Sequence, residues 1–294
     1  MKMIFVFIDG FGLGEHDKDK NPIYAANTPN LRYILENFNV IPTDATLGVP
    51  GLPQSATGQT AIFTGENASK VLGRHLNGQP TTTLKKLIIK NNMFKELASM
   101  GVSVTNSNAY RDEYLSKMLD TKDRRHRPSV TSVMTMSSGI EFRTIDRCYK
   151  MGKGVYHDIT GNILIESGYD VDLITPEEAA ERLYNISREY DFTLYEHFMT
   201  DIIGHKMDMD LAVREIELLD AFFGGLLKLL DLNEDILFIT SDHGNIEDTS
   251  VKTHTYNKVP TIIEGNIPKG ISLKVESLLD IMPTVVEIFK ANTK

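Results

Sequence analysis

The sequence has no tryptophan, a single cysteine and no low-complexity segment. The lone Cys148 can form neither an internal disulfide nor a zinc–thiolate cluster, which is typical of a protein in the reducing cytoplasm. Glycine and proline, 21 and 11 of 294 residues, are not enriched, so a collagen-like or disordered chain is excluded. A chain of this length is long enough to bury a sizeable core in one large α/β domain.

Basic residues are also few. The chain has 31 Lys and Arg residues against 40 Asp and Glu residues, for a net charge of −9. We therefore expect no non-specific binding to nucleic acid or to an anionic membrane, and an anionic substrate must be neutralised locally. Apolar runs are short as well, because none approaches the roughly 20 residues that cross a bilayer. The first run, residues 4–8, is too short for a signal peptide.

Short apolar runs alternate with helical patterns along the chain. Three runs that end close to an acidic residue indicate buried strands, at 4–8, 192–199 and 236–240. Helical patterns are found at 31–38, 84–100, 179–189, 210–230 and 278–289, and Thr175-Pro176-Glu177-Glu178 predicts a capping box before the third. This alternation predicts an α/β fold with a doubly wound, largely parallel sheet. Segment 109–174 breaks the pattern, so we predict a small inserted cap there, between core segments 1–108 and 175–294.

Acidic and imidazole side chains follow the three predicted strands. Asp9, Asp201 and Asp242 would share one edge of a parallel sheet, where their mutual repulsion requires a cation. His205 lies one helical turn after Asp201, and further imidazoles are His243 and His254. Mixed carboxylate and imidazole ligands suit zinc, manganese or iron. Each motif alone also fits a turn, a solvated pair or a strand exit, but their common position favours a metal site.

Ser55 is the remaining candidate. Small residues at 53–58 precede a helical run, which places Ser55 at a helix N-terminus, where free amides and the helix dipole favour an anion such as phosphate. A serine that only caps the helix is the structural alternative.

The order of these motifs resembles that of the alkaline phosphatase superfamily of metalloenzymes, above all its cofactor-independent phosphoglycerate mutase and phosphopentomutase branch. The motifs are Asp9-Gly10, the segment around Ser55, Asp201-x3-His205, residues 242–245 and residues 254–260. Residues 279–284 resemble the start of the superfamily's final helix. The resemblance covers 1–108 and 175–294, and the ordered set is far more specific than any one motif.

The resemblance implies two divalent metal ions, Mn²⁺ or Zn²⁺. One would be held by Asp201, His205 and His254, and the other by Asp9, Ser55, Asp242 and His243. Ser55 aligns with the family's nucleophile, and Thr57 is the fallback. The implied function is phosphoryl transfer on a small phosphorylated metabolite through a phosphoserine, as a phosphatase or a phosphomutase. Alternatives are a phosphodiesterase of the same superfamily and a non-catalytic, metal-stabilised binding protein.

The resemblance ends at the cap. Mutases of this type carry a much larger insertion that excludes water, so the small cap here favours hydrolysis. Its basic run 124–127 indicates a solvated face, with a phosphate-gripping lid as the alternative, and His157 is expected to be structural. Residues 55–59 lack the proline and arginine of the sulfatase motif. Candidates for a cation that faces the substrate are Arg74, His75, Arg111 and Arg143.

Overall fold

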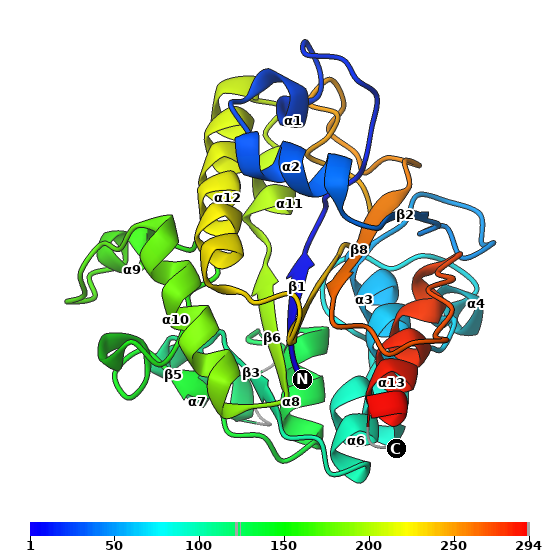
Figure 1. Ribbon diagram of the computed structural model, residues 1–294, viewed down its shortest axis with the longest axis vertical. Helices are drawn as coiled ribbons and strands as arrows, with labels where there is room; N and C mark the ends of the chain where they lie inside the picture. The colour runs from blue at the N-terminus through cyan, green and yellow to red at the C-terminus, as the bar shows by residue number, and fades with distance from the viewer. Residues whose placement is uncertain (121–122, 124, 293–294) are drawn as a thin grey trace.

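The computed structural model describes residues 1–120, 123 and 125–292. Its centre is a six-stranded sheet (Figure 1). The strands, in spatial order, are β2 (Val40–Thr43), β8 (Val259–Gly265), β7 (Asp235–Thr240), β1 (Lys2–Ile8), β6 (Phe192–His197) and β3 (Val104–Asn106). From β7 to β3 all neighbours are parallel, whereas β8 runs antiparallel to both β7 and β2. The predicted α/β fold with a largely parallel sheet is confirmed.

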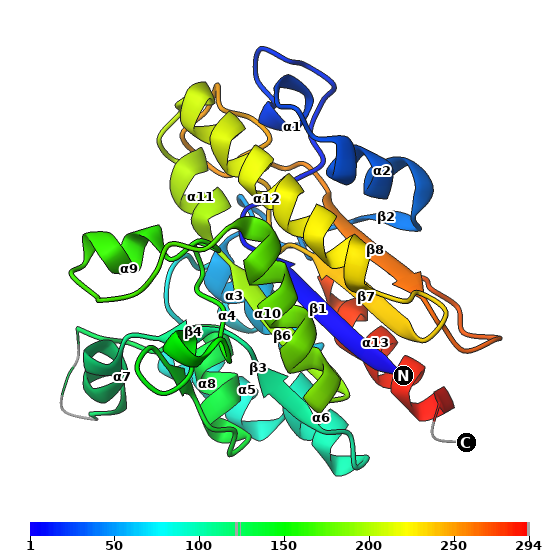
Figure 2. The ribbon, with the colours of Figure 1, turned by 60° about the vertical axis from the view of Figure 1, so that its left-hand side comes forward.

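Strand β1 is buried on both faces, which explains why its apolar run is continuous. Alternate side chains enter two core clusters, one with Ile4, Val6 and Ile8 and the other with Met3, Phe5 and Phe7. The first face is covered by α2 (Pro29–Asn37), α10 (Pro176–Glu189) and α12 (Met209–Leu229). The second is covered by α3 (Ser55–Thr64), α5 (Thr82–Lys90), α6 (Met93–Ser99), α8 (Val130–Ser137) and α13 (Ile281–Asn292). Figure 2 shows α10 and α12 in front of β1 and α13 behind it.

Most predicted helices are found close to their expected ends, and the capping box at Thr175 is present. The expected single helix at 84–100 is wrong, because the chain forms α5 and α6 with Asn91 and Asn92 between them. The side chain of Asn92 accepts a hydrogen bond from the Lys95 amide and caps α6. An asparagine that bonds to nearby backbone in this way competes with a continuous helix. Short helices elsewhere are α1 (Pro22–Ala25), α4 (Ala68–Leu72) and the 3₁₀ turn η2 (Leu278–Asp280).

Segment 109–174 packs against both core clusters. Its elements are β4 (Ala109–Tyr110), α7 (Asp112–Leu119), α8, β5 (Arg143–Thr144), η1 (Tyr149–Met151) and α9 (Asn162–Glu166), with β4 and β5 paired in parallel. Val133 and Met134 of α8 join the cluster of α3 and α13, whereas Tyr149 joins the cluster of α10 and α12. The division into a core and a cap stays a prediction. Of the basic run, Arg124 lies outside the described residues. Within them, no helix has the length and apolar character of a membrane span.

Candidate metal centre

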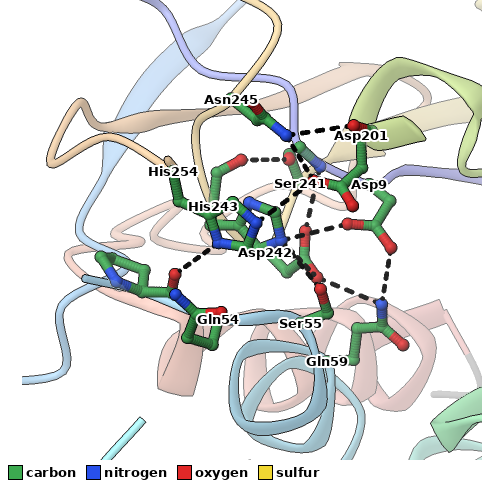
Figure 3. Close-up of polar contacts among 12 residues, drawn as sticks. Asp9, Gln54, Ser55, Gln59, Asp201, Ser241, Asp242, His243, Asn245 and His254 are labelled. Carbon is green, nitrogen blue, oxygen red and sulfur yellow. Dashed lines mark hydrogen bonds and ion pairs between the residues drawn. The ribbon is translucent and has the colours of Figure 1, made fainter. Parts of the chain in front are cut away.

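The carboxyl ends of β1, β6 and β7 meet at one edge of the sheet, and the predicted site residues lie there (Figure 3). Asp9 directly follows β1, and Asp242 and His243 follow β7. Asp201 lies on α11 (Met199–Gly204), the short helix after β6. The hydroxyl of Thr200 donates to the Asp9 carbonyl at 2.5 Å, which holds the ends of β1 and β6 together.

Asp201, His205 and His254 form what we call the outer group. Asp201 Oδ1 lies 3.5 Å from His205 Nε2 and 3.3 Å from His254 Nε2, and the two imidazole nitrogens are 3.2 Å apart. The Asn245 amide donates to Asp201 Oδ1 at 2.7 Å and orients the carboxylate. His205 is half-buried, with 35% of its side chain exposed, so this group is open to solvent.

Asp9, Ser55, Asp242 and His243 form the inner group, in which the side chains of Asp242 and His243 are fully buried. His243 Nε2 lies 3.1 Å from Asp9 Oδ1, 3.7 Å from Asp242 Oδ2 and 3.0 Å from the hydroxyl of Ser55. The Gln59 amide donates to Asp9 Oδ2 at 3.0 Å and to Asp242 Oδ2 at 3.2 Å. The inner group is therefore a closed network of two carboxyls, an imidazole, an amide and a hydroxyl.

Helix α3 brings Ser55 to this network. Ser55 is the first residue of the helix, and every residue of α3 is buried. A Cβ on Gly58 would lie 2.8 Å from the Asp242 carbonyl oxygen, so only glycine lets the helix approach so closely. The amides of Thr57 and Gly58 donate to Leu76 and Gln54, which leaves those of Ser55 and Ala56 for an anion among the described residues. Thr57 bonds to the Gln54 carbonyl and is fully buried, away from the cavity.

Burial and neighbouring charges shift the pKa values of the buried acids and imidazole. Burial raises the pKa of Asp242 well above its usual value, and the charge of Asp9 adds to the rise. Burial lowers the pKa of His243, but Asp242 and Asp9 outweigh it and raise the value to about 10. Burial alone would raise the pKa of Asp201, yet the hydrogen bond from His254 and the charge of His243 lower it to about 2. The raised pKa of Asp242 shows that burial beside Asp9 destabilises its ionised form, which a bound cation would stabilise.

The donor set fits divalent metal ions. Nδ1 of His205 faces the Lys252 carbonyl and Nδ1 of His254 faces that of Pro53, both at 2.8 Å. These carbonyls accept the Nδ1 protons, so Nε2 of each ring is the atom available to a metal ion, as in metal-binding histidines. Asp9 Oδ1 is buried, and its partner there is His243 Nε2 at 3.1 Å.

Two sets of ligand atoms lie within 4.8 Å of one another: Asp201, His205 and His254, and then Asp9, Asp201 and His243. The first set is the predicted outer group. The second set joins Asp9 and His243, two of the predicted inner ligands, to Asp201, so Asp201 lies near both groups. The assignment of ligands to each ion stays a prediction.

A cavity of about 470 Å³ opens over Ser55, Asp9 and Asp201. Of the four predicted cations, Arg111 lines it. Arg143 instead donates to Thr105, Asn106 and Lys153, and the His75 imidazole contacts Ser69 and the Val49 carbonyl. Arg74 is exposed outside the cavity lining.

Sequence reasoning missed three polar residues of the site. Glu196 lines the cavity, accepts a hydrogen bond from Thr131 at 2.5 Å, and has its pKa raised to about 7 by burial. A lone acid inside the apolar run 192–199 was the available signal. Gln59 lies one helical turn after Ser55, a spacing that places the two on one face. Glu247 accepts from the Gly12 and Asn245 amides and from Thr255, and so closes the loops that carry His254.

A family model for the metalloenzyme superfamily matches residues 1–293. The chain belongs to the metalloenzyme superfamily. Similar curated proteins include the 2,3-bisphosphoglycerate-independent phosphoglycerate mutases of Paracoccus denitrificans, 30% identical over 129 residues, and Ehrlichia canis, 34% identical over 128 residues. These matches cover 41% and 39% of this chain, and the chain spans 25% of each of those proteins.

Solved structures share the fold of this superfamily member over nearly its whole length. A Pyrococcus horikoshii protein matches with a TM-score of 0.62 at 17% identity, covering 99% of this chain and 97% of its own. The alkaline phosphatase of the Antarctic bacterium TAB5 matches with a TM-score of 0.58 at 13% identity, covering 99% and 98%. At such identities the likeness concerns the fold, which is that of alkaline phosphatase. The predicted superfamily resemblance is confirmed.

Proposed function

We propose that the protein is a two-metal phosphoryl-transfer enzyme that acts on a small phosphorylated metabolite through a phosphoserine at Ser55. The observation that carries the proposal is the position of the Ser55 hydroxyl. It lies at the N-terminus of α3, in the cavity, 3.0 Å from His243 in a network of carboxyls that needs a cation. The relatives named as phosphoglycerate mutases support this reaction class.

Mn²⁺ or Zn²⁺ fits the mixed donors of the outer and inner groups. When bound, two such ions lower the pKa of the nucleophilic hydroxyl and stabilise charge on the leaving oxygen. The chain's own part is to aim the Ser55 oxygen at phosphorus and to hold the phosphate with the free amides of Ser55 and Ala56. Arg111 supplies a further positive charge at the cavity wall.

In the first step the Ser55 oxygen bonds to phosphorus, the ester P–O bond breaks, and the alcohol leaves with a proton. In the second step water attacks the phosphoserine and releases inorganic phosphate, or another hydroxyl of the substrate accepts the phosphoryl group. We favour the hydrolytic outcome because segment 109–174 is short compared with the insertion of a water-excluding mutase. A phosphodiesterase and a non-catalytic binding protein are the alternatives.

The test is turnover of p-nitrophenyl phosphate by stripped protein after Mn²⁺ or Zn²⁺ is restored. We expect Ser55→Ala to lower kcat by about a thousandfold or more, since the nucleophile is lost. Thr57→Val, the matched control one position along the helix, should keep activity and yield a trapped phosphoserine at Ser55 by mass spectrometry. Loss in Thr57→Val but not in Ser55→Ala would make Thr57 the nucleophile.

Further substrates separate the alternatives. Preferential cleavage of bis-p-nitrophenyl phosphate would favour a diesterase. A phosphorylated product without free phosphate would favour a mutase. Metal binding without turnover of any ester would favour the binding protein and overturn the enzymatic proposal.

A further inference from the structure

The cavity beside Ser55 is walled by aromatic rings. Tyr110, Tyr114, Tyr156, His157 and Phe198 all line it. The rings of His157 and Phe198 are stacked, with centroids 4.0 Å apart and planes at 21°, and Tyr156 contacts His157 at 4.1 Å. Phe198 directly follows β6, and His157 comes from segment 109–174, so the stacked pair joins that segment to the sheet edge.

His157 is an uncharged member of this wall. Burial lowers its pKa to about 3, and the positive charges of His197 and Arg111 add to the shift. Its Nδ1 is buried without a hydrogen-bond partner among the described residues. His157 was expected to be structural, and that stays a prediction; its half-buried ring lines the cavity, whereas Nδ1 is buried. The ring packs against those of Phe198 and Tyr156 in the cavity wall, and a neutral imidazole does not hold an anion.

The charges around the cavity favour a substrate with a single anionic group. Among the described lining residues Arg111 is the one Lys or Arg, and it forms no ion pair there. Carboxyls line the same space, at Asp9, Asp201 and Glu196. Asp9 and Asp201 are predicted metal ligands, so a second phosphate or carboxylate away from the ions would meet Glu196, with Arg111 as the one Lys or Arg among the described lining residues. Uncharged polar groups of the substrate could instead form hydrogen bonds with polar side chains of the lining: Asn77, Gln79, Asn108, Ser129 and Ser132.

We propose that the site takes phosphate monoesters whose alcohol part carries a flat, uncharged ring, with the phosphate at Ser55 and the ring against His157 and Phe198. The inference rests on the proposed phosphoryl transfer at Ser55. A cavity of about 470 Å³ has the size of sites that enclose ligands of many atoms, which a compact three-carbon ester would not fill. Offset stacking on aromatic side chains is the interaction that selects flat rings.

Binding to the Mn²⁺-loaded protein tests the proposal without turnover. Calorimetry would compare benzylphosphonate with ethylphosphonate and with cyclohexylmethylphosphonate, whose ring is apolar but puckered. We expect benzylphosphonate to bind about tenfold more tightly than ethylphosphonate and about threefold more tightly than the saturated ring. The corresponding phosphate esters should follow the same order in kcat/KM.

Phe198→Leu removes the flat face while keeping an apolar side chain. It should weaken benzylphosphonate binding by about fivefold. Ethylphosphonate and inorganic phosphate should bind as before, and Phe198→Tyr should retain the selectivity. The matched control is Tyr33→Leu, an exposed aromatic on α2 that should change none of these values.

The outcomes separate this inference from the proposed function. Equal affinity for the three phosphonates, or equal weakening of all of them by Phe198→Leu, would overturn ring selectivity even if ethyl phosphate is hydrolysed. Selective binding of benzylphosphonate without turnover of any ester would support the ring site and overturn phosphoryl transfer.

Discussion

The outer and inner groups differ in their access to water. The side chain of His205 is 35% exposed and that of Asp201 is 17% exposed, whereas those of Asp242 and His243 are fully buried. A charge in the outer group is stabilised partly by solvent, but a charge in the inner group depends on its neighbours. The difference teaches that candidate ligands of the same chemical kind lie in different surroundings: the outer group is open to solvent, and the inner group is part of the folded core.

The largest expected effect comes from removing an inner imidazole. In His243→Ala, Asp9 and Asp242 lose their cationic partner. We expect kcat to fall by about a thousandfold or more and the unfolding free energy to fall by about 3–5 kcal/mol. In His205→Ala we expect a similar loss of turnover that excess metal partly restores, with stability changed by about 1 kcal/mol or less.

Urea unfolding and metal titration of both variants would measure this contrast, with His16→Ala as a control at an exposed histidine outside the site. Equal destabilisation by His243→Ala and His205→Ala would remove the distinction between the two groups.

Metal removal should have the next largest effect. A metal ion at about a hundred times its Kd adds about 2.7 kcal/mol to the free energy of unfolding. Loading the stripped protein with the ion should therefore raise Tm by about 5–10 °C. Because the buried acids lie in the inner group, His205→Ala should keep more than half of this rise. Differential scanning calorimetry on loaded and stripped samples gives the values. A rise that vanishes in His205→Ala would place the stabilising ion in the outer group instead.

Glu196 sharpens the comparison, because it is a buried carboxyl of the same cavity that accepts a hydrogen bond from the hydroxyl of Thr131. Burial raises its pKa from 4.5 to about 7, so the folded state keeps a proton that the unfolded state releases. Stability is therefore greatest below pH 4.5 for this group and falls as pH rises to about 7. The loss is of the order of 3 kcal/mol at most.

Glu196→Gln should remove this pH dependence in the stripped protein, since a glutamine does not ionise and still accepts from Thr131. Urea unfolding at acidic and alkaline pH would measure it, with the exposed Glu181→Gln on α10 as control. The same slope in Glu196→Gln and wild type would assign the pH dependence to another group.

Much of the sheet and the site edge followed from the sequence. A strand that is buried on both faces appears in the sequence as an unbroken run of apolar residues. An acidic residue just past such a run lies at the carboxyl end of the strand, as Asp9 and Asp242 do. Strands β2, β3 and β8 were missed. The first two are short, with four and three residues, and β8 has a proline, Pro260, at its second position, which weakens a strand pattern. The break between α5 and α6 was missed because the Asn92 side chain caps α6. A search for the spacing of apolar residues does not detect such a cap.

The cavity walls could not be predicted in the same way. His157 and Phe198 lie 41 positions apart by number, and their stacking depends on how segment 109–174 packs on the sheet edge. Likewise, nothing in the sequence separates Arg111, which faces the cavity, from Arg143, which bonds to the backbone of Asn106. Strand ends are set by local pattern, whereas these contacts arise from long-range packing.

The hydrogen bond between His254 and the Pro53 carbonyl links two loops that are far apart in sequence. Pro53 lies two residues before Ser55, and the other nitrogen of the same ring belongs to the outer group. The position of this imidazole is therefore tied to the position of the backbone that leads into α3. Through this single bond, the geometry of the more accessible half of the site is coupled to the placement of the serine hydroxyl.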